Sequence, residues 1–172
     1  MPCSPEILRR YPNQVFVETG TGGGSGIDAA LAAGFDQIQS IELSKSLFAK
    51  ACERFKNNKK VSIIQGDSSR VLGKLISPIT TPITFWLDAH YSYGDTAKGD
   101  KMTPLIEELR IIASHPIKSH VILIDDRRCL GTADMPPTEA EVIREIMAIN
   151  PSYQISYENA TILKDIIVAR IA

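Results

Sequence analysis

The sequence is poor in cysteine, and its cysteines form no recognisable pattern. Cys3, Cys52 and Cys129 are scattered along the chain, without a CxxC pair or the Cys/His spacing of a metal site. An odd and scattered set of this kind argues against a disulfide framework and against structural zinc. It favours reduced thiols, and we therefore expect a cytoplasmic protein.

The sequence also lacks long apolar runs and an excess of charge of either sign. No run approaches the length that spans a membrane, and the opening segment MPCSPEILRRYPNQ has no apolar core of signal-peptide length. The formal net charge is −1, which gives no electrostatic reason to expect a nucleic-acid partner. We expect a soluble protein that binds neither nucleic acid nor a membrane.

The sequence does contain a regular alternation of strand-like and helix-like segments. Its 172 residues suit one domain, residues 1–172, in which residues 1–14 form a short N-terminal extension. Apolar runs typical of strands occur at 15–19, 37–43, 61–65, 83–87 and 121–124, with helix-like segments at 27–33, 47–55, 69–76, 104–114 and 138–149. This alternation predicts a doubly wound α/β fold, with a mostly parallel sheet and helices on both of its faces.

Two segments depart from the alternation. Residues 153–157 and 165–171 are both strand-like, and the polar segment between them leaves no room for a helix. The sheet is therefore predicted to have seven strands and to finish in an antiparallel hairpin. Residues 90–103, HYSYGDTAKGDKMT, are polar and without periodicity, and we predict that they form an active-site loop.

A glycine-rich segment follows the first predicted strand. Residues 15–26 read VFVETGTGGGSG, so an apolar run ends in Glu18 and glycine then recurs up to the start of a helix. Without Cβ atoms, such a turn lets a ligand approach the main chain closely. A strand, a glycine turn and a helix in this order predict a site for a nucleotide-like ligand.

Every predicted parallel strand ends on an acidic residue or is followed closely by one. These residues are Glu18, Glu42, Asp67, Asp88, Asp125 and Asp126. In open α/β sheets the ligand crevice lies at the carboxyl ends of the strands, so we expect the six acids to share one crevice. Such a crevice suits a cationic ligand, the hydroxyls of a ribose, or a metal ion.

At this point the chain resembles the class I S-adenosylmethionine-dependent methyltransferases, which have a Rossmann-like fold whose sheet ends in a reversed strand. The run from Glu18 to Gly24 is similar to the first motif of that family, Glu42 to its ribose-binding acid, and Asp67 to its adenine-binding residue. The resemblance implies that this chain binds the methyl donor. The implied donor-binding set consists of Glu18, Thr19, Gly20, Thr21, Gly22, Gly24, Glu42, Leu43, Gly66, Asp67, Ser68 and Asp88.

A second resemblance concerns the acids after the fourth and fifth strands. The runs FWLDAH and VILIDDRR resemble the macrocin-type sugar O-methyltransferases, which depend on a metal ion. The resemblance implies that Asp88, Asp125 and Asp126 bind Mg²⁺, which takes oxygen ligands. Asp88 is thereby a candidate catalytic residue, and His90, two residues after it, is the candidate general base, because an imidazole can take the proton from the acceptor hydroxyl. The implied acceptor is a hydroxyl of a small molecule or a glycan precursor.

Several alternatives stay open from the sequence. Gly20, Gly22 and Ser25 approximate the spacing of an NAD fingerprint, so an NAD(P)-binding oxidoreductase is one alternative, and a non-catalytic binding domain is another. The three aspartates alternatively line the crevice, cap helices or contact a substrate amine. His90 alternatively orders its loop or hydrogen-bonds the substrate.

Other polar residues receive structural interpretations. Arg127 and Arg128 follow the acidic pair and are predicted to form salt bridges or to bind an anionic substrate group. His115 and His120 flank a proline in a connector and are predicted to be surface or capping residues. Because only a short segment precedes the first strand, we expect either an extended, partly exposed substrate or a homo-oligomer in which a neighbouring subunit completes the pocket.

Overall fold

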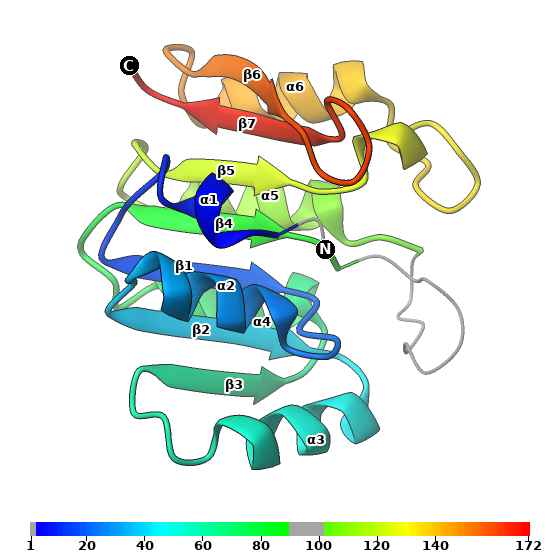
Figure 1. Cartoon of the computed structure of the whole chain (residues 1–172). Coiled ribbons are helices and arrows are strands. Elements are labelled where there is room, and N and C mark those ends of the chain that lie inside the picture. The colour runs from blue at the N-terminus through cyan, green and yellow to red at the C-terminus, as the bar shows by residue number, and fades with distance from the viewer. Residues whose placement is uncertain (1–2, 90–101) are drawn as a thin grey trace.

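A seven-stranded sheet forms the centre of the structure (Figure 1). This computed structural model describes residues 3–89 and 102–172. The strands lie in the order β3-β2-β1-β4-β5-β7-β6. β7 runs antiparallel to both of its neighbours, and the other pairings are parallel. The strands are β1 (Val15–Thr19), β2 (Gln37–Glu42), β3 (Val61–Gln65), β4 (Ile83–Leu87), β5 (Val121–Ile124), β6 (Gln154–Glu158) and β7 (Ile166–Arg170).

The prediction of a seven-stranded, mostly parallel sheet with a reversed C-terminal strand is therefore confirmed. Its physical basis is the apolar content of the strands: β1 and β4, at the centre, are buried at every residue. β3 and β6, at the two edges of the sheet, are only partly buried. Phe85 and Trp86 lie in the core, as the apolar run ITFWL predicts.

Helices cover both faces of the sheet, also as predicted (Figure 1). One face packs against α4 (Ser68–Ile76), α5 (Leu105–Ser114) and α6 (Glu139–Ile149) through buried leucines and isoleucines. The other face packs against α1 (Pro5–Leu8) and α2 (Ser25–Ala33), and receives Phe55 from the end of α3 (Lys45–Phe55). A 3-10 turn, η1 (Arg127–Cys129), follows β5.

Side-chain caps fix where several helices begin. Ser44 accepts a hydrogen bond from the backbone N–H of Leu47 at the start of α3. Thr138 and Glu141 form a capping box at the start of α6, in which each side chain accepts from the other residue's backbone N–H.

The N-terminal extension is more integrated than the sequence indicates. Ile7, Leu8 and Tyr11 are buried against the same sheet face as α2. The Tyr11 hydroxyl donates to Glu158 Oε1 at 2.6 Å, and the Thr84 hydroxyl donates to the Tyr11 carbonyl oxygen at 2.8 Å. This segment is part of the core because it closes the apolar face that the short α2 leaves open.

The prediction that His115 and His120 lie on the surface is wrong, whereas the alternative of a capping residue holds for His115, which is the C-cap of α5. Their side chains are 3% and 0% exposed, respectively. Both lie at the end of the sheet opposite the crevice, where β4 and β5 begin. They were misassigned because a connector is usually exposed, whereas here the rings fill the space between α4, α5 and β4.

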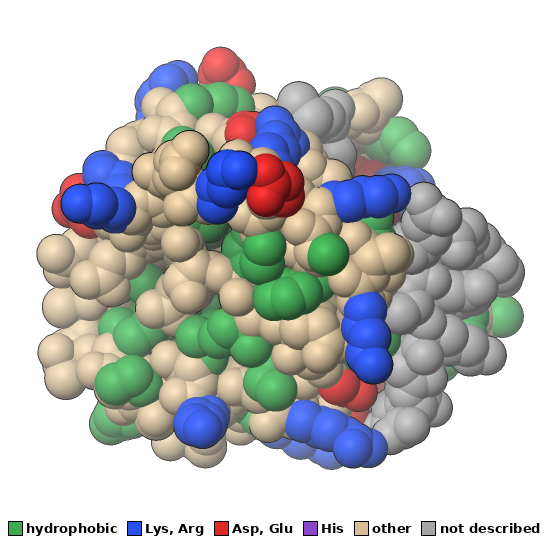
Figure 2. Space-filling model, turned by 90° about the horizontal axis from the view of Figure 1, so that it is seen from below, with side chains coloured by type: hydrophobic (Ala, Val, Ile, Leu, Met, Phe, Trp, Pro, Cys, Tyr) green, Lys and Arg blue, Asp and Glu red, His purple; other side chains and the backbone are tan. Residues whose placement is uncertain are grey.

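The surface around α3 is basic. Figure 2 views the molecule from that end and shows Lys and Arg side chains spread around a hydrophobic centre. The exposed basic residues of α3 and of the loop after it are Lys45, Lys50, Arg54, Lys56, Lys59 and Lys60. Among the described residues, no helix combines the length and the apolar character needed to cross a membrane.

Candidate functional site

The glycine turn lies at the carboxyl end of β1, directly against the segment that follows β4. A Cβ atom added to Gly20 would lie 2.5 Å from the carbonyl oxygen of Asp88, so the two backbones are in close contact. Gly20 and Thr21 donate backbone hydrogen bonds to the carbonyl oxygen of Ile41 at 2.9 and 3.2 Å. The turn is thereby fixed against β2 and β4, at the crevice edge of the sheet.

Glu42 closes this turn from the end of β2. Its Oε2 accepts the backbone N–H of Gly22 at 2.8 Å, and its Oε1 accepts that of Ser44 at 2.7 Å. The carboxyl group is 5% exposed. A carboxylate held at both oxygens by backbone donors keeps a fixed orientation and still has acceptor sites for a ligand's hydroxyls.

Glu18 is buried below the turn and belongs to a short chain of hydrogen bonds. Ser40 donates to Glu18 Oε2 at 2.6 Å, and because that proton is used, the Thr21 hydroxyl donates to Ser40 Oγ at 2.6 Å. Burial, opposed by the Ser40 hydrogen bond and assisted by the nearby Asp88 and Glu42 carboxylates, raises the pKa of Glu18 to about 8. This carboxyl group therefore has a strong electrostatic preference for a cationic neighbour.

The residues after β3 form the next side of the crevice. Asp67 caps α4: its Oδ1 accepts the backbone N–H of Ser69 at 2.9 Å and the Ser69 hydroxyl at 2.6 Å. Ser68, the first residue of α4, is buried, and the Gly66 N–H donates to the carbonyl oxygen of Glu42 at 2.9 Å. Leu43 is half-buried beside them and accepts from the Gln65 side chain at 3.0 Å.

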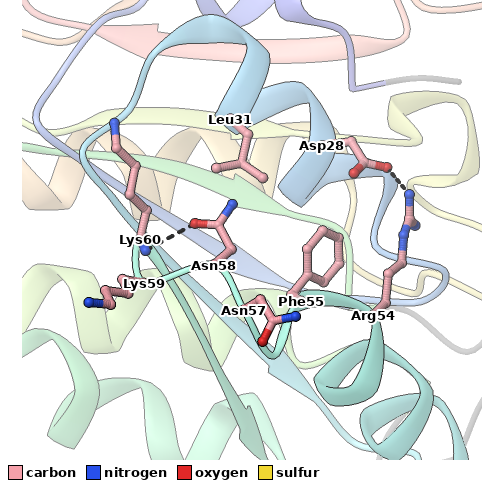
Figure 3. Close-up of a pocket in the computed structure, with 8 residues that line it drawn as sticks. All are labelled: Asp28, Leu31, Arg54, Phe55, Asn57, Asn58, Lys59 and Lys60. Carbon is pink, nitrogen blue, oxygen red and sulfur yellow. Dashed lines mark hydrogen bonds and ion pairs between the residues drawn. The ribbon is translucent and has the colours of Figure 1, made fainter.

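Arg54 and Phe55 support the glycine turn from α3. The Arg54 guanidinium donates to the Gly23 carbonyl oxygen at 2.5 Å and pairs with Asp28 in the first turn of α2. Figure 3 shows the Arg54–Asp28 ion pair at one side of an open groove, which the loop after α3 also lines. No local pattern in the sequence indicates this contact, because Arg54 is 31 positions from Gly23.

The acids after β4 and β5 come together as predicted. Asp88, Asp125 and Asp126 each offer a carboxylate oxygen, and these oxygens lie within 4.8 Å of one another. Neighbouring strands cause this: the Asp88 N–H donates to Thr19 O and the Asp125 N–H donates to Leu87 O, both at 3.1 Å. The acid cluster, as we call these three residues, therefore lies beside the glycine turn.

Within the acid cluster, the surroundings of Asp125 disfavour its charged form. Burial raises the pKa of Asp125 to about 8, and the Asp88 carboxylate adds to this shift. Asp125 Oδ2 is buried and has no hydrogen-bond partner among the described residues. Three carboxylate groups close together, one of which has an oxygen without a hydrogen bond among the described residues, fit the requirements of Mg²⁺ or a similar hard cation.

Arg127 and Arg128 form the salt bridges that were predicted for them. Arg128 pairs with Asp126 at 2.5 Å and also with Asp165, at the start of β7. Arg127 pairs with Glu139 at 2.8 Å. The acid cluster is thereby connected to the C-terminal hairpin.

One acid of this region escaped the sequence analysis. Glu108, in α5, is 1% exposed and lines a small cavity together with Asp88 and Asp125. Burial raises its pKa to about 7, although the facing hydroxyls of Ser68 and Thr19 favour the charged form. The available signal was helical spacing, since Leu105, Leu109 and Ile112 define a buried stripe that also contains position 108.

The predicted base His90 and the loop tyrosines Tyr91 and Tyr93 lie outside the described residues. The predicted active-site loop, residues 90–103, is described only from residue 102 onward. The predicted role of His90 therefore stays a prediction.

Comparison with known proteins gives contrasting results for sequence and structure. No protein-family model matches the sequence, and no curated protein matches it either. Solved structures match almost the whole chain. An O-methyltransferase from Bacillus cereus in complex with S-adenosylhomocysteine gives a TM-score of 0.69 at 14% identity, and the match covers 98% of this chain and 78% of that one.

Two further structures give similar scores. The O-methyltransferase TomG from Streptomyces achromogenes, involved in tomaymycin synthesis and solved with S-adenosylmethionine, has a TM-score of 0.66 at 18% identity, covering 98% of this chain and 77% of that one. SMU.1697c from Streptococcus mutans, in complex with S-adenosylhomocysteine, has a TM-score of 0.65 at 12% identity, covering 97% and 95%. This chain has the class I S-adenosylmethionine-dependent methyltransferase fold.

The methyltransferase fold accounts for the position of the acids. In open α/β sheets, ligands bind at the carboxyl ends of the strands, and here that edge carries the glycine turn, Glu42, Asp67 and the acid cluster. Identities below 20% establish the fold and leave the reaction to be argued from the site itself.

Proposed function

We propose that this protein is an S-adenosylmethionine-dependent O-methyltransferase that methylates a hydroxyl of a small molecule or glycan precursor with the help of Mg²⁺. The observation that carries the proposal is the acid cluster, whose carboxylate oxygens lie within 4.8 Å of one another beside the glycine turn. The fold supplies a donor site, and the cluster adds a place for a cation next to it. The resemblance of FWLDAH and VILIDDRR to the macrocin-type enzymes supports a hydroxyl acceptor.

The residues around the turn fit the methyl donor. S-adenosylmethionine supplies a methyl group bound to a positively charged sulfur. Glu42 would accept from the ribose hydroxyls, Asp67 would contact the adenine as the resemblance implies, and the buried Glu18 would pair with the donor's ammonium group. The bare backbone of the turn leaves room for close approach.

The acid cluster fits a divalent cation. Mg²⁺ supplies positive charge that lowers the pKa of an adjacent hydroxyl. Asp88, Asp125 and Asp126 would hold it, each through one carboxylate oxygen. His90, two positions after Asp88, is proposed to take the hydroxyl proton.

The NAD(P)-dependent alternative is less consistent with the sheet. The common dinucleotide-binding sheet has the order 3-2-1-4-5-6, whereas here β7 is inserted antiparallel between β5 and β6. A non-catalytic binding domain would have no need for an acid cluster in which burial and the neighbouring Asp88 raise the pKa of Asp125.

Donor binding is tested by calorimetric titration with S-adenosylhomocysteine. The wild-type protein is expected to bind it and to ignore NAD. Glu42→Ala removes an ionic acceptor for two hydroxyls and is expected to weaken binding by about 30-fold or more. Glu53→Ala, an exposed glutamate on α3, is the matched control. Absence of binding to the wild-type protein would contradict the proposal.

The acceptor is tested by transfer of labelled methyl to a panel of sugars, nucleotide-sugars, phenols and amines, with and without Mg²⁺. Transfer to hydroxyls that requires Mg²⁺ is expected. Transfer to amines alone, or transfer that chelation leaves unchanged, would contradict the acceptor class or the role of the cation, respectively.

A neighbouring subunit that completes the pocket remains part of the proposal, with an extended and exposed substrate as the alternative. The two matched O-methyltransferases are longer, since this chain covers 77% and 78% of them. Light scattering of the purified protein separates a homo-oligomer from a monomer.

A further inference from the structure

A small cavity lies beneath the acid cluster, between the ends of β4 and β5 and the first turn of α5. Its polar lining residues are Asp88, Thr103, Glu108 and Asp125, and apolar side chains such as Leu105 and Met135 complete it. The space open to the centre of a water molecule is about 10 Å³, which is near the lower limit for a single water.

Two carboxylate oxygens of the residues that line this cavity are buried and have no hydrogen-bond partner within residues 3–89 and 102–172. They are Glu108 Oε1 and Asp125 Oδ2, on side chains that are 1% and 2% exposed. A buried acceptor without a hydrogen bond costs roughly 1–3 kcal/mol, and more when it is charged. Two such oxygens in one small cavity are therefore evidence for a ligand that donates hydrogen bonds.

A water molecule fits this cavity better than a cation that Glu108 would coordinate directly. Within the described residues, the carboxylates close enough together to share one ion are those of Asp88, Asp125 and Asp126, and Glu108 is not in that set. A water molecule has two hydrogens to donate, one for each unpartnered oxygen.

We propose that Glu108 is a positioning residue of the acid cluster, which binds an ordered water molecule in this cavity and through it orients the carboxylate of Asp125. The water would donate to Glu108 Oε1 and to Asp125 Oδ2. The other Asp125 oxygen, Oδ1, accepts the backbone N–H of Asp126 at 2.8 Å. Both oxygens of Asp125 would then be fixed.

The consequence for cation binding rests on the proposed function. Partners in the outer shell of a metal site orient its ligands, and their loss typically weakens metal binding by 10- to 100-fold. Glu108 is suited to this task because it projects from the first turn of α5, a rigid helix packed against α4 and α6.

The water itself is tested by a crystal structure of the wild-type protein at a resolution that shows ordered solvent. The expected result is density for one water within hydrogen-bond distance of Glu108 and Asp125. A dry cavity, or a direct hydrogen bond between the two carboxyl groups, would overturn the proposal. This test needs no bound metal and no activity.

The positioning role is tested by Mn²⁺ binding, measured by electron paramagnetic resonance on three variants. Glu108→Leu removes the acceptor and is expected to weaken binding by about 10- to 100-fold. Glu108→Gln keeps an acceptor oxygen and is expected to stay within about 3-fold of the wild type. Glu107→Leu, on the same turn of α5 but not among the described residues that line the cavity, is the control.

Wild-type affinity in a folded Glu108→Leu protein would overturn the positioning role. If Glu108→Leu does not fold, an effect of Glu108→Gln as large as 10-fold or more would overturn it instead. If the wild-type protein binds no Mn²⁺, the metal part of the proposed function fails, and the crystal structure alone then decides whether Glu108 holds a water.

Discussion

At the scale of single residues, Gly24 shows how closely the glycine turn is fitted to its support. It caps α2 with φ +83°, a conformation that side chains disfavour. A Cβ atom there would lie 2.6 Å from the Phe55 ring. The turn is therefore held by α3 packing as well as by the hydrogen bonds to Glu42.

Gly24→Ala is expected to lower the free energy of unfolding by about 3 kcal/mol, since backbone strain of about 1–2 kcal/mol adds to displacement of the Phe55 ring. Gly34→Ala is the matched control, because Gly34 has φ +99° and nothing within 4 Å of the added atom. It should cost only the backbone strain. Urea denaturation measures both, and equal losses would show that the ring contact is unimportant.

The raised pKa of Glu18 has a consequence for stability. The unfolded chain ionises this residue near its ordinary pKa of 4.5, and the folded protein only near 8. Between these values the folded state binds more protons than the unfolded state, so the contribution of Glu18 to stability declines as pH rises. The decline begins near pH 4.5 and ends near pH 8.

Glu18→Gln is expected to remove this decline. Its effect on the free energy of unfolding of the ligand-free protein should be more favourable at pH 8 than at pH 4.5, by an amount on the order of 4 kcal/mol. Denaturation in urea at a series of pH values measures the change. Glu53→Gln, an exposed residue, should leave the pH profile unaltered. If Glu18→Gln showed the same dependence of stability on pH as the wild type, Glu18 would not be the cause of the decline.

At the scale of elements, the buried histidines join α4, α5 and β4 at the end of the sheet opposite the crevice. The Ile83 N–H donates to His120 Nδ1 at 3.0 Å, and His120 Nε2 lies 3.1 Å from His115 Nδ1. His115 Nε2 faces the carbonyl oxygens of Ile76 and Ile79, both at 3.1 Å. Carbonyls only accept and the Ile83 N–H only donates, so both rings are assigned as neutral, with the proton on Nε2.

This arrangement predicts loss of stability in acid. Burial, together with the neighbouring His115, lowers the pKa of His120 from 6.5 to about 4. The contribution of neutral His120 to stability is present above pH 6.5 and declines as pH falls to about 4. The reason is that His120 takes up a proton at a higher pH in the unfolded chain than in the folded protein. We expect a loss of about 2 kcal/mol over this interval.

His120→Gln tests this prediction, since glutamine can replace the hydrogen bonds but does not titrate. The variant is expected to be less stable than the wild type at pH 7 and to show a flatter decline between pH 6.5 and 4 in urea denaturation. A decline as steep as that of the wild type would assign the acid sensitivity to other groups.

Helices and strands were largely predictable because their signals are local. The apolar runs, the cap at Ser44 and the capping box at Thr138 each lie within a few residues of the element they define. Glu108 had a local signal as well, an acid on a buried helical stripe. The two histidines had none, since their partners Ile76 and Ile83 come from elsewhere in the chain.

At the scale of the whole molecule, charge is distributed unevenly. The crevice edge gathers the acids that follow β1 to β5, while the α3 end is basic (Figure 2). The net charge of −1 conceals this separation. A cation bound in the crevice would relieve repulsion among carboxylates that the fold brings together.

Mg²⁺ at millimolar concentration is therefore expected to raise the melting temperature by about 2–4 °C, equivalent to about 1 kcal/mol for a chain of this size. Thermal denaturation with and without a chelator measures the shift. Asp126→Asn should abolish the shift with Mg²⁺ while the shift with S-adenosylhomocysteine persists. A Mg²⁺ shift that survives in Asp126→Asn would place the cation elsewhere.

The sequence by itself determined the order of the strands along the chain, the reversed ending and the acids at the strand ends, because hydrophobic period, caps and short loops are local properties. Only the tertiary structure decided which side chains from other elements join these acids. It added Glu108 from α5 to the cavity that Asp88 and Asp125 line, and it set Arg54 under the glycine turn. Those contacts depend on which strands and helices become neighbours, and no spacing within one segment encodes that.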